Sequence, residues 1–163
     1  MLAAGLWYFI QWLHYLALAL WIGGIAFISV AAPAAHGSMA SKAVAGEIVG
    51  KILKRLNTIE FFCFFILAMT LLLSFRFVRQ HQERLGVLLV ILLVMGLLAS
   101  FYAFYLTPRM QSLKEQIPTL DALSTNNTVK AEFDRLHTIY VRLMSLNLVL
   151  GLSLLYGSVV VLK

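Results

Sequence analysis

Four apolar blocks, each long enough to cross a lipid bilayer, constrain the fold of this chain more than any other feature. They cover about residues 6–32, 58–77, 85–106 and 140–162. A hydrocarbon core about 30 Å thick requires about 20 residues of helix, and backbone groups within lipid must find their partners inside the same segment. The sequence therefore predicts an all-α integral membrane protein, a bundle of four transmembrane helices.

The composition supports this assignment. Of the 163 residues, 61% are hydrophobic and only 12% are charged, with a mean hydropathy of +0.89. A soluble domain has far more charged residues, so the lipid bilayer is the expected partner of the chain. The length favours a single membrane domain over residues 1–163. The net charge of +6 lies mainly between the blocks, where it sets topology, and no nucleic-acid partner is expected.

An amphipathic helix is expected between the first and second spans, over residues 44–56. Apolar residues lie on one face of this segment and basic residues around the other (Val44, Ile48, Val49, Ile52, Leu53 and Leu56; Lys51, Lys54 and Arg55). It is predicted to lie at the membrane interface or to form a projecting first part of the second span.

Two further breaks organise the second half of the chain. Pro108, which lacks an amide donor, is expected to end the third span. Pro118 and the polar residues 124–127 predict a turn. A helix is expected to start at about residue 128 and to continue into the fourth span, so that it begins outside the membrane.

The distribution of basic residues predicts the orientation. Four spans place both termini on one side, which carries four Lys and Arg residues, whereas the other side carries nine (Arg76, Arg79, Arg84 and Lys163; Lys42, Lys51, Lys54, Arg55, Arg109, Lys114, Lys130, Arg135 and Arg142). Because loops rich in Lys and Arg stay in the cytoplasm, we expect a multi-pass cell-membrane protein, in the inner membrane if bacterial, with non-cytoplasmic termini.

A polar and aromatic stripe on the first span is expected to face the bundle interior (Trp7, Gln11, His14, Leu18, Trp21 and Ile25). His14 is the only histidine placed within the hydrocarbon. A neutral imidazole ligates haem iron or copper, or it hydrogen-bonds to a neighbouring helix, and both interpretations stay open. Gly24, after Trp21, suits close approach by a helix or a flat cofactor. Gln11, Trp21 and Gly24 are therefore candidate cofactor-binding residues beside His14, and Met69 is a candidate second axial ligand.

A second stripe is expected on the fourth span (His137, Tyr140, Met144, Asn147 and Gly151), with Asn147 joining helices through its amide. His14 and His137 differ in depth, so they should not ligate one iron. His36 and His137 lie on the same side as Glu60, and they form either a metal-binding cluster or separate solvated groups. His14, His36 and His137 are thus the metal candidates.

Short motifs along the chain resemble a known family: Leu13-His14, Trp21-Ile22-Gly23-Gly24, Ala32-Pro33, Leu136-His137 and Leu146-Asn147-Leu148. Their order is similar to the domain-of-unknown-function 4149 family, which includes the transmembrane protein 205 group. The spacing from His14 to Trp21 is also similar to the copper-resistance D family and the HemJ-type protoporphyrinogen oxidases, which implies a haem-associated histidine. The latter carry a basic residue after the first-span proline, whereas this chain has Ala34.

Two functions follow as hypotheses. One is a protein of the copper-resistance D-like superfamily that binds haem b or copper in the bundle and acts in redox or metal homeostasis. The alternative is a non-catalytic accessory subunit of a larger membrane complex, such as an electron-transfer complex, or a homo-oligomer, packing through the aromatic residues of the second span (Phe61, Phe62, Phe64 and Phe65). No nucleotide-binding, nucleophile-elbow or zinc-protease motif is present, which argues against an enzyme.

Overall fold

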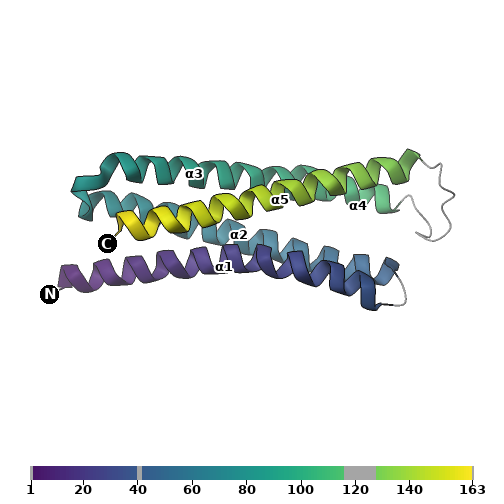
Figure 1. The fold of residues 1–163 in the computed structure, drawn as a ribbon, viewed down its shortest axis with the longest axis horizontal. Coiled ribbons are helices and arrows are strands. Elements are labelled where there is room, and N and C mark those ends of the chain that lie inside the picture. The colour runs from purple at the N-terminus through teal and green to yellow at the C-terminus, as the bar shows by residue number, and fades with distance from the viewer. Residues whose placement is uncertain (1, 40–41, 116–127, 163) are drawn as a thin grey trace.

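The computed structural model describes residues 2–39, 42–115 and 128–162, and every element in them is helical (Figure 1). The elements in chain order are α1 (Leu2–Ser38), α2 (Lys42–Phe77), the short 3₁₀ turn η1 (Arg79–His81), α3 (Gln82–Phe101), the π-helical turn η2 (Tyr102–Leu106), α4 (Thr107–Glu115) and α5 (Thr128–Val161). The turn expected around Pro118 and residues 124–127 lies outside the described residues.

Four long helical segments make the bundle, and α1 packs along α2 while α3 packs along α5. Both chain ends lie at the same end of the bundle (Figure 1). Within the described residues, four segments are long and apolar enough to cross a membrane: Gly5–Ser38, Val44–Phe77, Arg79–Lys114 and Thr128–Val161. The predicted all-α bundle of four spans is therefore confirmed.

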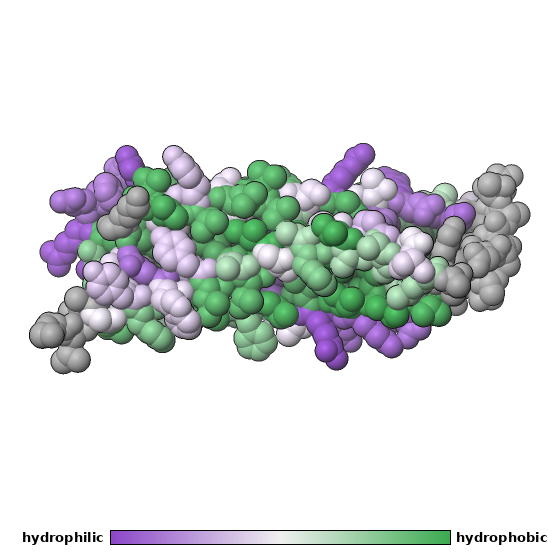
Figure 2. Space-filling model, turned by 60° about the horizontal axis from the view of Figure 1, so that its bottom comes forward, coloured by the Kyte–Doolittle hydropathy of each residue, from purple (hydrophilic) through white to green (hydrophobic). Residues whose placement is uncertain are grey.

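The helices are longer than a bilayer requires. At about 1.5 Å per residue, a helix of this length reaches about 50 Å, against a hydrocarbon core of about 30 Å. Residues 44–56 form the first part of α2, the second of the two arrangements expected for them, and α5 begins at Thr128, ahead of its apolar part. Hydrophobic residues cover the middle of the visible surface, and hydrophilic residues gather toward its ends (Figure 2).

Pro108 does not end the third helix, which corrects the prediction. The chain stays helical to Glu115, and the interruption is the π turn η2 just before the proline. The Thr107 amide there bonds to the Tyr102 carbonyl, five residues back instead of four. The new α-helix begins at Thr107, so Pro108 lies in its first turn, where the missing amide donor is not required.

Small residues bring the helices close together at three places, Gly24, Gly96 and Gly157. A Cβ atom added to Gly24 of α1 would lie 2.4 Å from the Leu56 side chain of α2, and one added to Gly96 of α3 would lie 2.5 Å from the Phe64 ring. Large residues elsewhere point outward, as in a protein whose solvent is lipid: Phe62 is 67% exposed. The apolar core between the helices includes Leu18, Leu67 and Leu154, all of them fully buried.

Candidate functional site

The bundle buries polar side chains in two groups that lie at different positions along its axis. We call the group near the chain ends the terminal cluster (Gln11, His14, Thr70 and Ser158) and the group toward the opposite end the loop-side cluster (Asn57, Glu60, Tyr102, Tyr140 and Asn147). His14, Glu60, Asn147 and Ser158 are each 0% exposed. Polar groups at this depth are costly without partners, so their hydrogen bonds show what each cluster can do.

His14 uses both of its ring nitrogens within the terminal cluster. Nδ1 lies 2.8 Å from Thr70 Oγ1, and Nε2 lies 2.9 Å from Ser158 Oγ. The Thr70 hydroxyl donates its single proton to the Leu67 carbonyl, 3.0 Å away, so it accepts from Nδ1–H. The Ser158 hydroxyl then donates to Nε2. His14 is thus a neutral imidazole that joins α1 to α2 and α5.

The residues predicted to bind a cofactor together with His14 contact other parts of the protein or face outward. Gln11 Nε2 donates to the Leu162 carbonyl and so satisfies an acceptor at the C-terminal end of α5. Gly24 is covered by the Leu56 side chain. Met69, the candidate second axial ligand, is 58% exposed and lies on the outer surface of α2. Trp21 is fully buried, as the inward-facing stripe predicted.

Glu60 is the centre of the loop-side cluster. The Tyr102 hydroxyl donates to Glu60 Oε2 at 2.7 Å, and Asn147 Nδ2 donates to the Tyr102 hydroxyl at 3.0 Å. Asn147 Nδ2 also lies 3.4 Å from the Met95 carbonyl. The rings of Tyr102 and Tyr140 meet edge to face with centroids 5.3 Å apart. A chain of two hydrogen bonds therefore links Asn147 of α5, through Tyr102 of η2, to the Glu60 carboxyl group of α2.

Several buried polar atoms in and around this cluster have no hydrogen-bond partner within the described protein: Glu60 Oε1, Asn57 Oδ1, Asn147 Oδ1 and Trp21 Nε1. The Asn57 side chain lies beside the Tyr140 hydroxyl. The antiparallel pairing that places Leu56 over Gly24 sets Trp21 at the level of Glu60. Unpaired buried polar atoms are rare in native proteins, and three of these four are oxygens that can accept a hydrogen bond or coordinate a cation.

The π turn contributes directly to this arrangement, because Tyr102 is its first residue. The Thr107 hydroxyl donates to the Tyr102 carbonyl at 2.8 Å, which supports the widened turn. Single π turns within α-helices occur often at functional sites, since they change the direction of nearby side chains. The irregular backbone and the unpaired oxygens thus occur at the same place in the bundle.

The metal-binding cluster of His36, His137 and Glu60, one of the two alternatives, does not form in the described part of the chain. His36 is exposed and bonds to the Ala32 carbonyl of its own helix at 2.8 Å, and His137 is exposed and stacks on Phe133 at 6.3 Å between centroids. Among the described residues, no three His, Cys, Asp or Glu side chains are grouped to hold a metal ion. On α5 the predicted inward stripe is confirmed from Tyr140 to Gly151, but it excludes His137, which faces outward.

Sequence reasoning assigned Glu60 to the membrane interface and Asn147 to helix packing, and it did not select Asn57 or Tyr102. One signal was present: Asn57 and Glu60 are three residues apart, on the same face of a helix that continues into an apolar span. An ionisable residue in such a position is a candidate for function. No local pattern distinguished Tyr102 from the other aromatic residues of the third span.

Comparison with known proteins gave one match. A family model described as "Domain of unknown function (DUF4149)" matches residues 16–119. No curated protein and no solved structure matches the chain. The matched residues include Trp21, Glu60 and Tyr102, whereas His14, Tyr140 and Asn147 lie outside the match.

Proposed function

Since the chain belongs to the DUF4149 family, whose description assigns no activity, we propose that it binds a small hard cation at Glu60 inside the membrane and acts without catalysis in metal-ion homeostasis. One observation carries the proposal: Glu60 is fully buried, with one carboxyl oxygen bonded to Tyr102 and the other unpaired, in a cluster that contains further unpaired oxygens. A bound cation would neutralise the carboxylate and pair these oxygens.

The donor set decides which cation fits. Carboxylate, amide carbonyl and hydroxyl oxygens suit hard ions such as alkali and alkaline-earth cations, whereas copper and haem iron favour imidazole or sulfur ligands. Glu60, Asn57 and Asn147 supply oxygens, and the two histidines nearest this end of the bundle, His36 and His137, face outward. The ligand chemistry therefore supports a hard cation at the loop-side cluster.

The hypothesis of haem b or copper at His14 fits the geometry less well. Both ring nitrogens are already hydrogen-bonded, so ligation would displace Thr70 or Ser158 and leave a buried hydroxyl without its partner. An ultraviolet–visible spectrum and elemental analysis of protein purified from membranes supplied with haem and copper test this directly. A Soret band or bound copper that His14→Ala abolishes would restore the hypothesis.

Of the four phenylalanines proposed as the contact surface of an accessory subunit, two are exposed and two pack against other parts of the bundle. Phe61 packs against Phe104 with centroids 5.3 Å apart, and Phe64 lies over Gly96, so neither is free for a partner. Phe62 and Phe65 are 67% and 64% exposed. If a larger complex exists, crosslinking from these two positions should capture another membrane subunit or a second copy of this chain, and crosslinking to lipid alone would argue against it.

Orientation remains a prediction, with the termini outside the cytoplasm and the loop-side cluster nearer the cytoplasmic face. An alkaline-phosphatase fusion after Lys163 should be active. If that fusion were inactive while a cytoplasmic reporter at the same position worked, the loop-side cluster would lie nearer the opposite face.

Carbodiimide labelling tests the cation site. A hydrophobic carbodiimide reacts with protonated carboxyl groups inside membranes, so it should label Glu60 in nanodiscs, and the label should be absent from Glu60→Gln. At constant pH, one of Na⁺, K⁺, Mg²⁺ or Ca²⁺ should protect Glu60 from labelling. Glu47→Gln, which changes an exposed carboxylate, is the matched control and should behave as the wild type. Labelling of Glu60 that none of the four ions reduces would contradict the proposal.

A further inference from the structure

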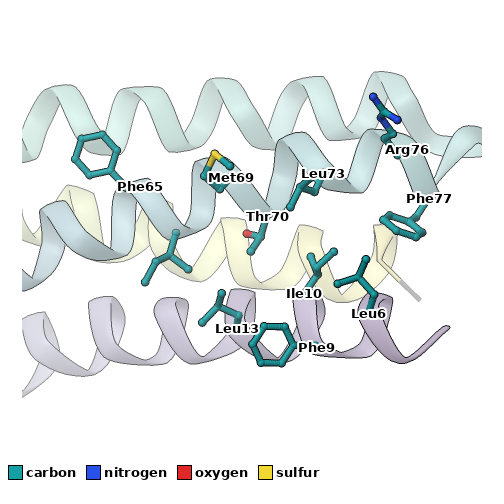
Figure 3. A pocket seen from close by; sticks show the side chains of 11 residues that line it. Leu6, Phe9, Ile10, Leu13, Phe65, Met69, Thr70, Leu73, Arg76 and Phe77 are labelled. Atoms are coloured by element: carbon teal, nitrogen blue, oxygen red, sulfur yellow. The ribbon is translucent and has the colours of Figure 1, made fainter. Parts of the chain in front are cut away.

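An outward-facing groove lies between α1 and α2, near the end of the bundle where the chain begins and ends (Figure 3). Its volume is about 710 Å³. Leu6, Phe9 and Leu13 line it from α1, and Met69, Leu73 and Phe77 line it from α2. Both walls are therefore apolar and face the surrounding lipid, in contrast to the two buried polar clusters.

The length of the groove matches one leaflet of a bilayer. On α2 its lining runs from Phe65 to Arg76 and Phe77. The eleven helical steps from Phe65 to Arg76 span about 16 Å, which is about half of a hydrocarbon core about 30 Å thick. Arg76 lies in the last turn of α2, where we expect the lipid headgroups. We therefore infer that the groove extends from the membrane surface to about the midplane.

The two ends of the groove differ in charge. Arg76 lines the surface end, is exposed, and has no ion-pair partner among the described residues. Thr70 is the other polar residue of the lining, and its hydroxyl is already bonded to His14 and to the Leu67 carbonyl. At the rim, Trp7 and Phe77 stack with centroids 5.0 Å apart, as aromatic residues do at a membrane interface.

We propose that this groove is a specific site for an anionic phospholipid of the leaflet on the terminal side. One acyl chain lies along the apolar walls, and the phosphate group meets the Arg76 guanidinium. Arginine pairs well with phosphate because its planar donors bond to two oxygens at once. The apolar walls end at the positively charged Arg76 side chain at headgroup depth. This match of shape and charge selects an anionic lipid over a zwitterionic one. The site is independent of the proposed cation site at Glu60.

Native mass spectrometry of the detergent-purified chain tests the proposal. The protein is titrated with phosphatidylglycerol and with phosphatidylcholine of the same acyl chains. We expect one phosphatidylglycerol to bind more tightly than phosphatidylcholine, and Arg76→Gln to weaken it about fivefold, the equivalent of about 1 kcal/mol. Arg79→Gln is the matched control, because Arg79 lies in η1 outside the groove, and it should leave binding unchanged.

A second pair of variants tests the groove itself. Leu73→Trp places a bulky indole ring in the groove and should weaken the binding of phosphatidylglycerol. Leu72→Trp, at an exposed neighbouring position outside the lining, should leave this binding unchanged. Unchanged thermal unfolding of both variants would show that the bundle is intact. If Arg76→Gln and Arg79→Gln weaken phosphatidylglycerol binding equally, the basic turn attracts anionic lipids without a specific site. That result would overturn the proposal. Equal binding of the two lipids, or a dimer that Leu73→Trp alone dissociates, would also overturn it.

Discussion

The terminal and loop-side clusters both place buried polar side chains in the same bundle, yet they differ in how their polar atoms are paired. In the terminal cluster, both nitrogens of His14 and the hydroxyls of Thr70 and Ser158 have partners. In the loop-side cluster, Glu60 and Asn147 each have one oxygen without a partner. A fully paired cluster joins helices, whereas an incompletely paired one can accept a ligand at no loss of existing hydrogen bonds.

An apolar layer separates the two clusters. Leu67 of α2 and Leu154 of α5 lie between members of the two clusters in their helices. Leu18 of α1 and Leu92 of α3 are buried as well, and each of the four leucines is at most 1% exposed. No continuous polar path therefore crosses this part of the described bundle, which agrees with the different depths of the two stripes in the sequence.

Glu60→Gln should have the largest effect, because it removes the charge that distinguishes the loop-side cluster. At a cation concentration about 100 times its dissociation constant, the wild type should gain about 2.7 kcal/mol of stability, and the variant should gain none. Thermal unfolding in nanodiscs with and without the protecting cation measures this difference. An equal rise in Tm for Glu60→Gln would show that the cation binds elsewhere.

Gly96→Leu tests whether the close packing of Phe64 on Gly96 holds α2 and α3 together. The new side chain meets the Phe64 ring, and overpacking of this kind costs about 1–3 kcal/mol. Gly86→Leu is the matched control, because nothing lies within 4 Å of its added Cβ. If the two variants melt at the same temperature in detergent, close packing at Gly96 does not contribute to stability.

His14→Ala should destabilise the bundle without changing cation binding. It removes two interhelical hydrogen bonds, worth about 0.6 kcal/mol each in a membrane, and it leaves a cavity, for a total loss of about 2 kcal/mol. His36→Ala, at an exposed position, should have no effect. Thermal unfolding and carbodiimide protection, measured on the same samples, separate the two properties. Loss of cation protection in His14→Ala would mean that the clusters are coupled.

Tyr102→Phe is expected to have the smallest effect on stability, about 1 kcal/mol. It removes the hydroxyl that bridges Glu60 and Asn147, while the ring and its contact with Tyr140 remain. Tyr105→Phe is the control, since Tyr105 is 61% exposed. Cation protection of Glu60 should weaken in the first variant only. If both variants protect as the wild type does, the bridge does not position the carboxylate.

Hydropathy determined the features of this protein that depend on local sequence. The length of the apolar segments predicted four spans with both termini at one end, because a bilayer requires a similar length of every helix that crosses it. Their periodicity predicted the inward face of α1. The family was evident from short motifs along the chain. Pro108 shows the limit of local rules, because a proline was expected to end the third span. The π turn of the preceding residues instead places Pro108 in the first turn of a new α-helix, where proline is tolerated.

Only the tertiary structure decided which polar residues meet. His14 pairs with Thr70 and Ser158, which are 56 and 144 residues away, and Glu60 pairs with Tyr102, 42 residues away. These pairings depend on the rotation and depth of each helix relative to its neighbours, which are set by contacts such as Leu56 over Gly24 and Phe64 over Gly96. Periodicity predicts which face of a helix is buried, but it cannot select the partner across the interface, because every inward face contains several residues at similar depth.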